Sequence, residues 1–156
     1  TLDDAIALRE AGINARIAVL YMSPVEDIPL LLHYDIETAA LDSAWAEAAD
    51  RAVSASGGGP LRVHLWIDTG MSWEGVVPDD ALPVARTIED SPHLELAGIA
   101  THFGAITPED SAAIAANDTA NRTVIQKMRF DGAVEQIRGA GLGQNALIHA
   151  GATDTS

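Results

Sequence analysis

Three segments of the sequence hold side chains that could bind or polarise a small molecule, and each stands where a predicted strand ends. They are Asp68-Thr69-Gly70-Met71, Thr101-His102-Phe103-Gly104 and His149-Ala150-Gly151-Ala152-Thr153, and a fourth strand end carries Tyr21-Met22-Ser23-Pro24. Carboxylates, hydroxyls and imidazoles hydrogen-bond polar ligands, and an imidazole can transfer a proton near neutral pH. Each segment alone also fits an ordinary turn. Together they predict one pocket, because the carboxyl ends of parallel strands share a rim.

The elements that must position these segments alternate between helix and strand along the chain. Strands are expected at residues 15–22, 36–41, 61–68, 94–103 and 146–150, and helices at residues 2–12, 25–33, 42–54, 78–90 and 108–139. The strands are short apolar runs bounded by turn residues, and the helices have apolar residues three and four positions apart. Strands that alternate with helices indicate βα units and a parallel sheet.

The strand at residues 61–68 narrows the fold class. Its side chains alternate between an apolar set, Val63, Leu65 and Ile67, and a mostly polar set, Arg62, His64, Trp66 and Asp68. A strand buried on both faces of an open parallel sheet is almost wholly apolar, whereas a polar face fits the inside of a barrel near its mouth. A complete (β/α)8 barrel takes about 250 residues, and this chain has 156. The sequence therefore predicts an α/β fold, either a partial (β/α)8 TIM-type barrel with parallel strands or a smaller open sheet.

The composition argues against several classes of function. A net charge of −14 does not suit binding to nucleic acid or to an anionic membrane, and the absence of cysteine excludes disulfides, thiolate metal sites and a cysteine nucleophile. The five histidines lack the spacing of a zinc site, Ser72 is not in a nucleophile elbow, and no glycine run opens a helix as a phosphate loop does. With no visible signal peptide or membrane span, we expect a cytoplasmic protein.

The strand ends and their surroundings resemble the alanine racemase family. His64-Leu65-Trp66-Ile67-Asp68-Thr69-Gly70-Met71 is similar to the family's His-Leu-Lys-x-Asp-Thr-Gly-Met-x-Arg-x-Gly signature, and residues 94–103 are similar to its Leu-x-Gly-Ile-x-Thr-His-Phe strand. Gln126 and Phe130 match its Gln-x-x-x-Phe helix, and His149 with Thr153 falls at its His-x-x-Asn-Ser. Residues 5–12 resemble its Leu-Arg-x-Ala-Gly helix. The matches follow the family's order over essentially the whole chain.

The resemblance implies a pyridoxal 5′-phosphate-dependent amino-acid racemase, an isomerase that inverts Cα. Residues 1–156 would be part of its cofactor-binding barrel domain, without the C-terminal β-domain. By this resemblance the cofactor-binding residues are His102, His149 and Thr153, and the substrate side is shaped by Trp66, Asp68, Met71 and Trp73. The expected partners are a small amino-acid substrate and, for the full-length protein, a second copy in a homodimer.

The sequence also departs from the family pattern. Trp66 replaces the family's lysine in the signature strand, and Trp73 replaces the arginine that helps to hold the substrate carboxylate. The family's Schiff-base lysine would precede Thr1 and its tyrosine base would follow Ser156, so no catalytic residue is assigned within this chain. The chain's single lysine, Lys127, is expected on an outer helix, remote from the mouth.

Three interpretations follow from these residues. In the first, the chain is an internal part of a racemase barrel and is inactive by itself. In the second, it belongs to a catalytically inactive relative that binds the cofactor or a partner. The third is a small α/β protein with an unrelated role, against which the polar strand face argues. The two tryptophans fit either an altered choice of substrate or a simple repacking of the space left by the lysine and arginine.

Overall fold

The computed structural model describes residues 1–154, with the side chains of residues 105, 106, 153 and 154 left aside. The strands are β1 (Ile17–Val19), β2 (Ile36–Ala40), β3 (Leu61–Ile67), β4 (Leu94–Ile106) and β5 (Leu147–Asp154). The helices are α1 (Leu2–Glu10), α2 (Ile28–His33), α3 (Ser43–Ser56), α4 (Ala81–Asp90), α5 (Pro108–Ala116) and α6 (Arg122–Gly139), with 3-10 turns η1 (Val25–Asp27) and η2 (Pro78–Asp80).

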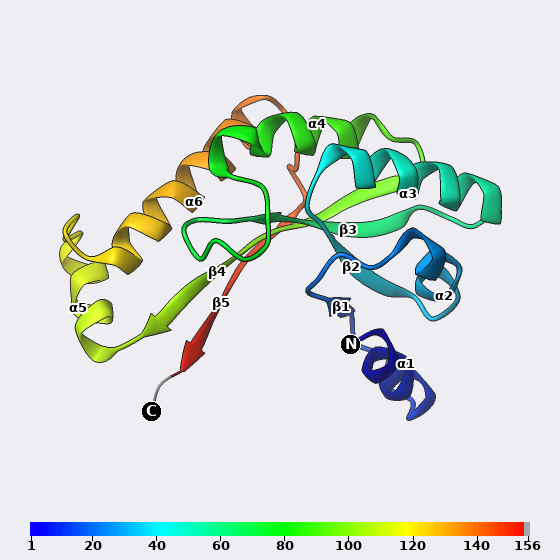
Figure 1. The fold of residues 1–156 in the computed structure, drawn as a ribbon, viewed down its shortest axis with the longest axis horizontal. Coiled ribbons are helices and arrows are strands. Elements are labelled where there is room, and N and C mark those ends of the chain that lie inside the picture. The colour runs from blue at the N-terminus through cyan, green and yellow to red at the C-terminus, as the bar shows by residue number, and fades with distance from the viewer. Residues whose placement is uncertain (155–156) are drawn as a thin grey trace.

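The five strands form one parallel sheet in the order of the chain, β1-β2-β3-β4-β5. The sheet is curved, and α3, α4 and α6 follow its outer side, while the inner side is open between α1 and the end of β5 (Figure 1). This arrangement is the half-barrel that the sequence predicts for a partial (β/α)8 barrel. The two edges of the half-barrel are β1 and β5.

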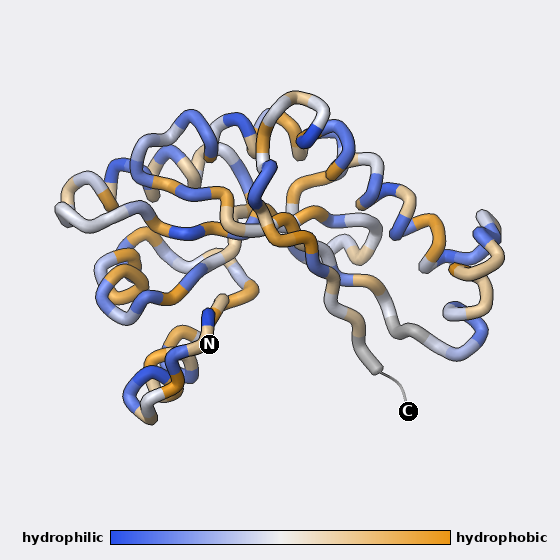
Figure 2. The backbone as a smooth tube through the Cα atoms, turned by 180° about the vertical axis from the view of Figure 1, so that it is seen from behind, coloured by the Kyte–Doolittle hydropathy of each residue, from blue (hydrophilic) through white to orange (hydrophobic). Residues whose placement is uncertain are grey.

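The main core lies between the outer face of the sheet and the helices. Its fully buried large aliphatic side chains include Ile28, Leu31, Val53, Leu61, Val63, Leu65, Ile67, Ile88, Ile99 and Ile137. The apolar set of β3 is therefore on the helix side, as its alternation predicts. A second, small apolar cluster of Ala39, Trp66 and Ala100 with Leu41 belongs to the other face of the sheet. Figure 2 shows hydrophobic stretches along the central strands and hydrophilic positions along the outer helices.

The helical region predicted at residues 108–139 is wrong as one continuous element. It is split into α5 and α6, because Asn117 ends α5 in the left-handed conformation with φ of 52°. Asn121 then begins α6 by accepting hydrogen bonds from the amides of Thr123 and Val124. Asparagine tolerates the left-handed region and competes for backbone hydrogen bonds, which explains both the stop and the restart.

The first and last strands differ in length from the prediction. β1 is shorter at both ends, and at its start the Arg9 guanidinium donates hydrogen bonds to the carbonyls of Ile13 (2.7 Å) and Ala15 (2.6 Å). Arg9 also donates to the carbonyls of Tyr34 and Asp35, so one side chain ties together the segments that lead into β1 and β2. β5 is longer than predicted, since its pairing with β4 continues to Asp154. Across the described part of the chain, no helix is both long and apolar enough to cross a membrane.

Candidate functional site

The structure brings the predicted strand-end segments to one rim. In the register of the sheet, Thr101 of β4 pairs with Ile67 of β3, and His102 pairs with Gly151 of β5. The segments that begin at Asp68, Thr101 and His149 are thus neighbours, as predicted, but only the first follows the end of its strand, because β4 continues to Ile106 and β5 to Asp154. The Thr101 hydroxyl strengthens this rim by donating to the Ile67 carbonyl at 2.7 Å.

A pocket of about 390 Å³ opens at this rim. It is lined by Leu20, Trp66, Trp73, Glu74 and His102. The Trp73 and His102 rings meet edge to face with centroids 5.3 Å apart, and the Trp73 side chain is 60% exposed. Trp66 is 7% exposed and packs on Ala39 and Ala100. Two indoles, an imidazole and one carboxylate give this pocket aromatic walls without a cation among its lining residues.

The loop after β3 is built around the Asp68 carboxylate. Its Oδ1 accepts hydrogen bonds from the amides of Gly70 (2.8 Å), Met71 (2.8 Å) and Ser72 (3.1 Å). These bonds hold a tight turn, in which Ser72 takes a positive φ of 60°, a strained value for a residue other than glycine. Asp68 therefore shapes the loop that carries Trp73. The assignment of Asp68 and Met71 to a substrate stays a prediction.

Helix α6 fixes the same loop from the outside. Arg129 donates to the Thr69 carbonyl at 3.1 Å, and Arg122 donates to the Gly70 carbonyl at 3.3 Å. Gln126 accepts from the Gly104 amide at 3.2 Å, so one helix holds both the loop that follows β3 and the last part of β4. The Gln-x-x-x-Phe motif pointed to this helix, but the supporting role of Arg122 and Arg129 was not predicted.

Next to the pocket, a row of hydrogen-bonded polar side chains runs across the strands of the sheet, from β2 through β3 to β5. His64 Nδ1 lies 2.8 Å from His149 Nε2, and His64 Nε2 lies 2.7 Å from Glu37 Oε2. Arg16 and Arg62 also donate to the Glu37 carboxylate. Glu37 and His64 are buried, at 1% and 3% exposure. Glu37 was not predicted as a site residue, although an acidic residue within an otherwise uncharged strand was the available signal.

The pKa values of Glu37 and His149 in this hydrogen-bonded network are both lowered, which leaves Glu37 charged and His149 neutral. Burial by itself would raise the pKa of Glu37, but hydrogen bonds from His64, Arg16 and Arg62 outweigh it and hold the pKa well below its usual range. Glu37 is therefore ionised at neutral pH. For His149, burial lowers the pKa, and the positive charge of the nearby Arg16 lowers it further. The His149 ring is accordingly neutral at neutral pH.

The remaining predicted residues are placed as follows. Thr153 lies in β5, but its side chain is outside the described residues. Lys127 lies on α6, a helix on the outer side of the sheet as the sequence indicates (Figure 1), where it is half exposed and pairs with Asp131. Gly151 lies against the His102 ring, since a Cβ there would be 3.0 Å from His102 Nδ1.

These residues fit one wall of a site for pyridoxal phosphate. A planar pyridine ring can lie against indole and imidazole rings, and Gly151, which has no Cβ, lets the His102 ring lie close to the backbone of β5 beside Trp73. Among the lining residues of the pocket, none carries a positive charge for a phosphate. Within residues 1–154, the one lysine is Lys127 on the outer helix. At this pocket, residues 1–154 thus offer the cofactor ring contacts but no lysine to which it could be covalently bound.

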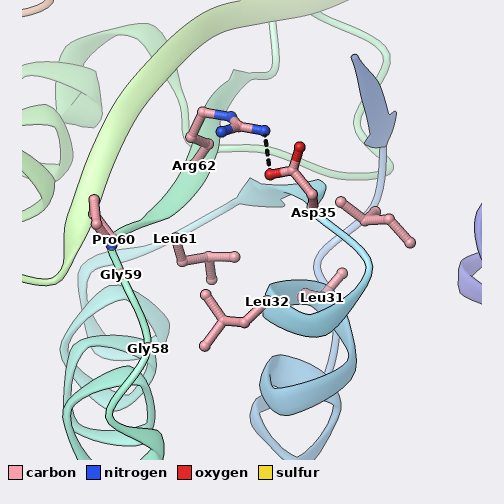
Figure 3. Close-up of a pocket in the computed structure, with 9 residues that line it drawn as sticks. Leu31, Leu32, Asp35, Gly58, Gly59, Pro60, Leu61 and Arg62 are labelled. Carbon is pink, nitrogen blue, oxygen red and sulfur yellow. Dashed lines mark hydrogen bonds and ion pairs between the residues drawn. The ribbon is translucent and has the colours of Figure 1, made fainter. Parts of the chain in front are cut away.

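A different pocket, of about 210 Å³, lies at the opposite end of the sheet, where β2 and β3 begin (Figure 3). Leu31, Leu32 and Pro60 line it together with Asp35 and Arg62. The Arg62 guanidinium is already paired with the Asp35 carboxylate at 2.8 Å (Figure 3). The start of barrel strands is the end associated with stability rather than with ligand binding, so the candidate site remains the rim at the carboxyl ends.

Comparison with known proteins gives one consistent family. The family model described as "Alanine racemase, N-terminal domain" matches residues 1–156. An alanine racemase of Treponema denticola is 35% identical over 150 residues, which cover 96% of this chain and 38% of that protein. The chain therefore spans 38% of the length of this relative.

Solved structures agree on the fold. An alanine racemase of Clostridium difficile 630 in complex with cycloserine superposes with a TM-score of 0.79 at 20% identity, covering 96% of this chain and 38% of that one. An alanine racemase from Oenococcus oeni superposes with a TM-score of 0.72 at 29% identity, covering 96% and 39%. These matches confirm the half-barrel as part of a larger barrel fold.

Proposed function

We propose that the whole protein is a pyridoxal-phosphate-dependent amino-acid racemase, on the premise that this chain belongs to the alanine racemase family. The observation that carries the proposal is the family match from residue 1 to residue 156, which includes the strand ends that meet at the rim. We further propose that residues 1–156 form part of the cofactor-binding barrel domain. The rest of the barrel and the catalytic groups would come from the remainder of the protein.

Racemisation requires that a proton leaves Cα on one face and returns on the other. Pyridoxal phosphate, when bound, supplies an electron sink for the negative charge that develops at Cα. In this proposal His102, His149 and Thr153 contact or support the cofactor. The His102 ring is held in place by its edge-to-face contact with Trp73, and His149 by its hydrogen bond to His64. Their part is to position a planar ligand.

The substrate side would be formed by Trp66, Asp68, Met71 and Trp73. Trp66 is rigidly packed and makes an apolar floor, whereas Trp73 is exposed on a loop fixed by Asp68. Large apolar surfaces exclude water from the reacting carbon and strengthen electrostatic interactions there. Since two indoles make this wall large and apolar, it favours an amino acid with a larger apolar side chain over alanine.

The test is made on the full-length protein loaded with pyridoxal phosphate. Racemisation of L-alanine and of a panel of larger amino acids is followed by chiral chromatography, and bound cofactor is followed by its absorbance. We expect bound cofactor and turnover of at least one amino acid, with alanine not preferred. Trp73→Arg is expected to shift the preference toward alanine. Ordinary alanine racemisation by the wild type, unchanged by this substitution, would contradict the proposed role of Trp73.

A second candidate function is a catalytically inactive relative that binds the cofactor or a partner. The observation that favours it is the same cation-free pocket, with Trp66 and Trp73 at positions where the family has a lysine and an arginine. Stoichiometric cofactor binding without turnover of any amino acid in the panel would support this candidate and reject the racemase. A full-length protein that binds no pyridoxal phosphate would reject both.

We also propose that the full-length protein is a homodimer and cytoplasmic, as the family resemblance suggests. The dimer is tested by light scattering of the full-length protein in the presence of cofactor. A single species of twice the chain mass is expected, and a monomer at micromolar concentration would contradict it.

A further inference from the structure

We propose that Glu37 is a positioning residue, which acts through His64 to hold the His149 ring with a hydrogen on Nε2 and an unprotonated Nδ1. His149 then offers a hydrogen-bond acceptor, and not a donor, to whatever lies against it at the rim. Only the identification of that rim as a cofactor site rests on the proposed function.

The first link is the Glu37 carboxylate, which has no hydrogen to donate. Its Oε1 accepts from Arg16 Nε at 2.7 Å and from Arg62 Nε at 2.9 Å. Its Oε2 accepts from Arg16 Nη2 at 2.8 Å and lies 2.7 Å from His64 Nε2. A carboxylate that is ionised and buried requires a donor at each contact. The hydrogen between Glu37 and His64 therefore belongs to His64 Nε2.

The second link is His64 Nδ1, which lies 2.8 Å from His149 Nε2. Around the buried His64 ring, the charges of Arg16 and Arg62 are already balanced by those of Glu37 and Asp35. A hydrogen on both nitrogens of His64 would add an uncompensated positive charge to a side chain that is 3% exposed, which is unfavourable.

His64 is thus neutral, and its Nδ1 accepts the hydrogen bond. The donor must be His149 Nε2. Because burial and the charge of Arg16 lower the pKa of His149, its ring is neutral and carries no second hydrogen. Within the described residues, His149 Nδ1 makes no hydrogen bond, so its lone pair is available at the inner side of β5.

The backbone is shaped to allow this contact across a strand. Glu37 is on β2, His64 on β3 and His149 on β5, so the His64 ring has to pass over β4 to reach its partner. The residue of β4 beside His64 is Gly98. A Cβ at Gly98 would lie 2.2 Å from His64 Nδ1, the atom that contacts His149. A glycine at this point is what admits the ring.

The isosteric substitution Glu37→Gln is expected to exchange donor and acceptor in both hydrogen bonds of His64. Two guanidinium Nε–H groups point at the Oε1 position, so the glutamine carbonyl is held there. Its amide NH₂ then faces His64 Nε2, which must become an acceptor. His64 moves its hydrogen to Nδ1 and donates to His149 Nε2, and His149 carries its hydrogen on Nδ1. The half-exposed Arg16 can turn its Nη2 to water.

The experiment uses the full-length, cofactor-loaded protein with ¹⁵N-labelled histidine. Long-range ¹H–¹⁵N spectra at neutral pH report which nitrogen of each imidazole carries the hydrogen, and the His149→Gln spectrum assigns the His149 signals. We expect Nε2–H for His149 in the wild type and Nδ1–H in Glu37→Gln. The matched control is Asp35→Asn, an equally isosteric change at a 72% exposed carboxyl in the same network (Figure 3), which should leave the wild-type pattern unchanged.

Two results would overturn the proposal: Nδ1–H for His149 in the wild type, or an unchanged pattern in Glu37→Gln. If Glu37→Gln does not fold, His64→Phe replaces it, and His149 is expected to lose its single tautomer. A single Nε2–H tautomer in His64→Phe would also overturn it. None of these readouts depends on turnover. A racemase in which His149 has the other tautomer would overturn only this proposal, and an inactive protein with the expected tautomer would overturn only the proposed function.

Discussion

Replacing Gly98 by alanine tests the packing on which the hydrogen-bonded chain depends. The added Cβ would lie 2.2 Å from His64 Nδ1 and 2.7 Å from Cε1, whereas ordinary contacts begin at 3.4 Å. The ring must therefore retreat by roughly 1 Å, which breaks its 2.8 Å contact with His149. Overpacking costs about 1–3 kcal/mol, and a buried nitrogen left without a partner costs about 1–3 kcal/mol more. Gly98 does not have a positive φ, so backbone strain adds nothing to this cost.

The assay is thermal and urea unfolding of the full-length protein, with Gly132→Ala as a matched control. Gly132 lies inside α6, and a Cβ there meets no atom within 4 Å. The same substitution is therefore expected to stabilise α6 by about 0.5–1 kcal/mol through helix propensity. Opposite signs for the two alanines are the expected result. A Gly98→Ala protein as stable as the wild type, with His149 in its wild-type tautomer, would refute the reasoning.

Three further predictions concern other contacts. The pKa of Glu37 is lower in the folded than in the unfolded chain, so its stabilising effect is full above the ordinary value of 4.5 and is lost as pH falls toward the folded value. In Glu37→Gln, the free energy of unfolding should therefore fall less steeply below pH 4.5 than in the wild type. Urea unfolding at several pH values measures this difference. Asn121→Ala removes the cap of α6 and should cost about 1 kcal/mol, with faster hydrogen exchange at the Thr123 and Val124 amides. Asp68→Ala leaves three loop amides without their acceptor and should release Trp73 from His102, seen as a weaker aromatic circular dichroism signal.

Much of the fold follows from local patterns. The alternation of β3 predicts one face toward the helices and one toward the barrel interior, and the structure has both. The strand-end segments meet because parallel strands must end on the same side. The break between α5 and α6 was missed because Asn117 and Asn121 interrupt a stretch whose flanks are both helical.

The buried hydrogen-bonded chain is harder to predict because it depends on register. Glu37 and His64 are 27 residues apart, and His64 and His149 are 85 apart. Their contact requires the irregular pairing between Val63 and His64, which sets His64 beside Gly98. A shift of one residue in that pairing would place another side chain there. No local sequence pattern predicts such a shift. Gly98 was recognised as part of its strand, but no role was predicted for it.

The attachment of the rim loops to α6 has a consequence for how such a site can evolve. Arg122 and Arg129 contact the backbone of the loop after β3, Gln126 contacts the backbone of β4, and none of the three lines the pocket. Exchanges on this outer helix can therefore retune the tilt of Trp73 while every lining residue stays the same. Two members of a lineage with identical pocket residues can then differ in substrate preference, and a comparison limited to those residues would miss the cause.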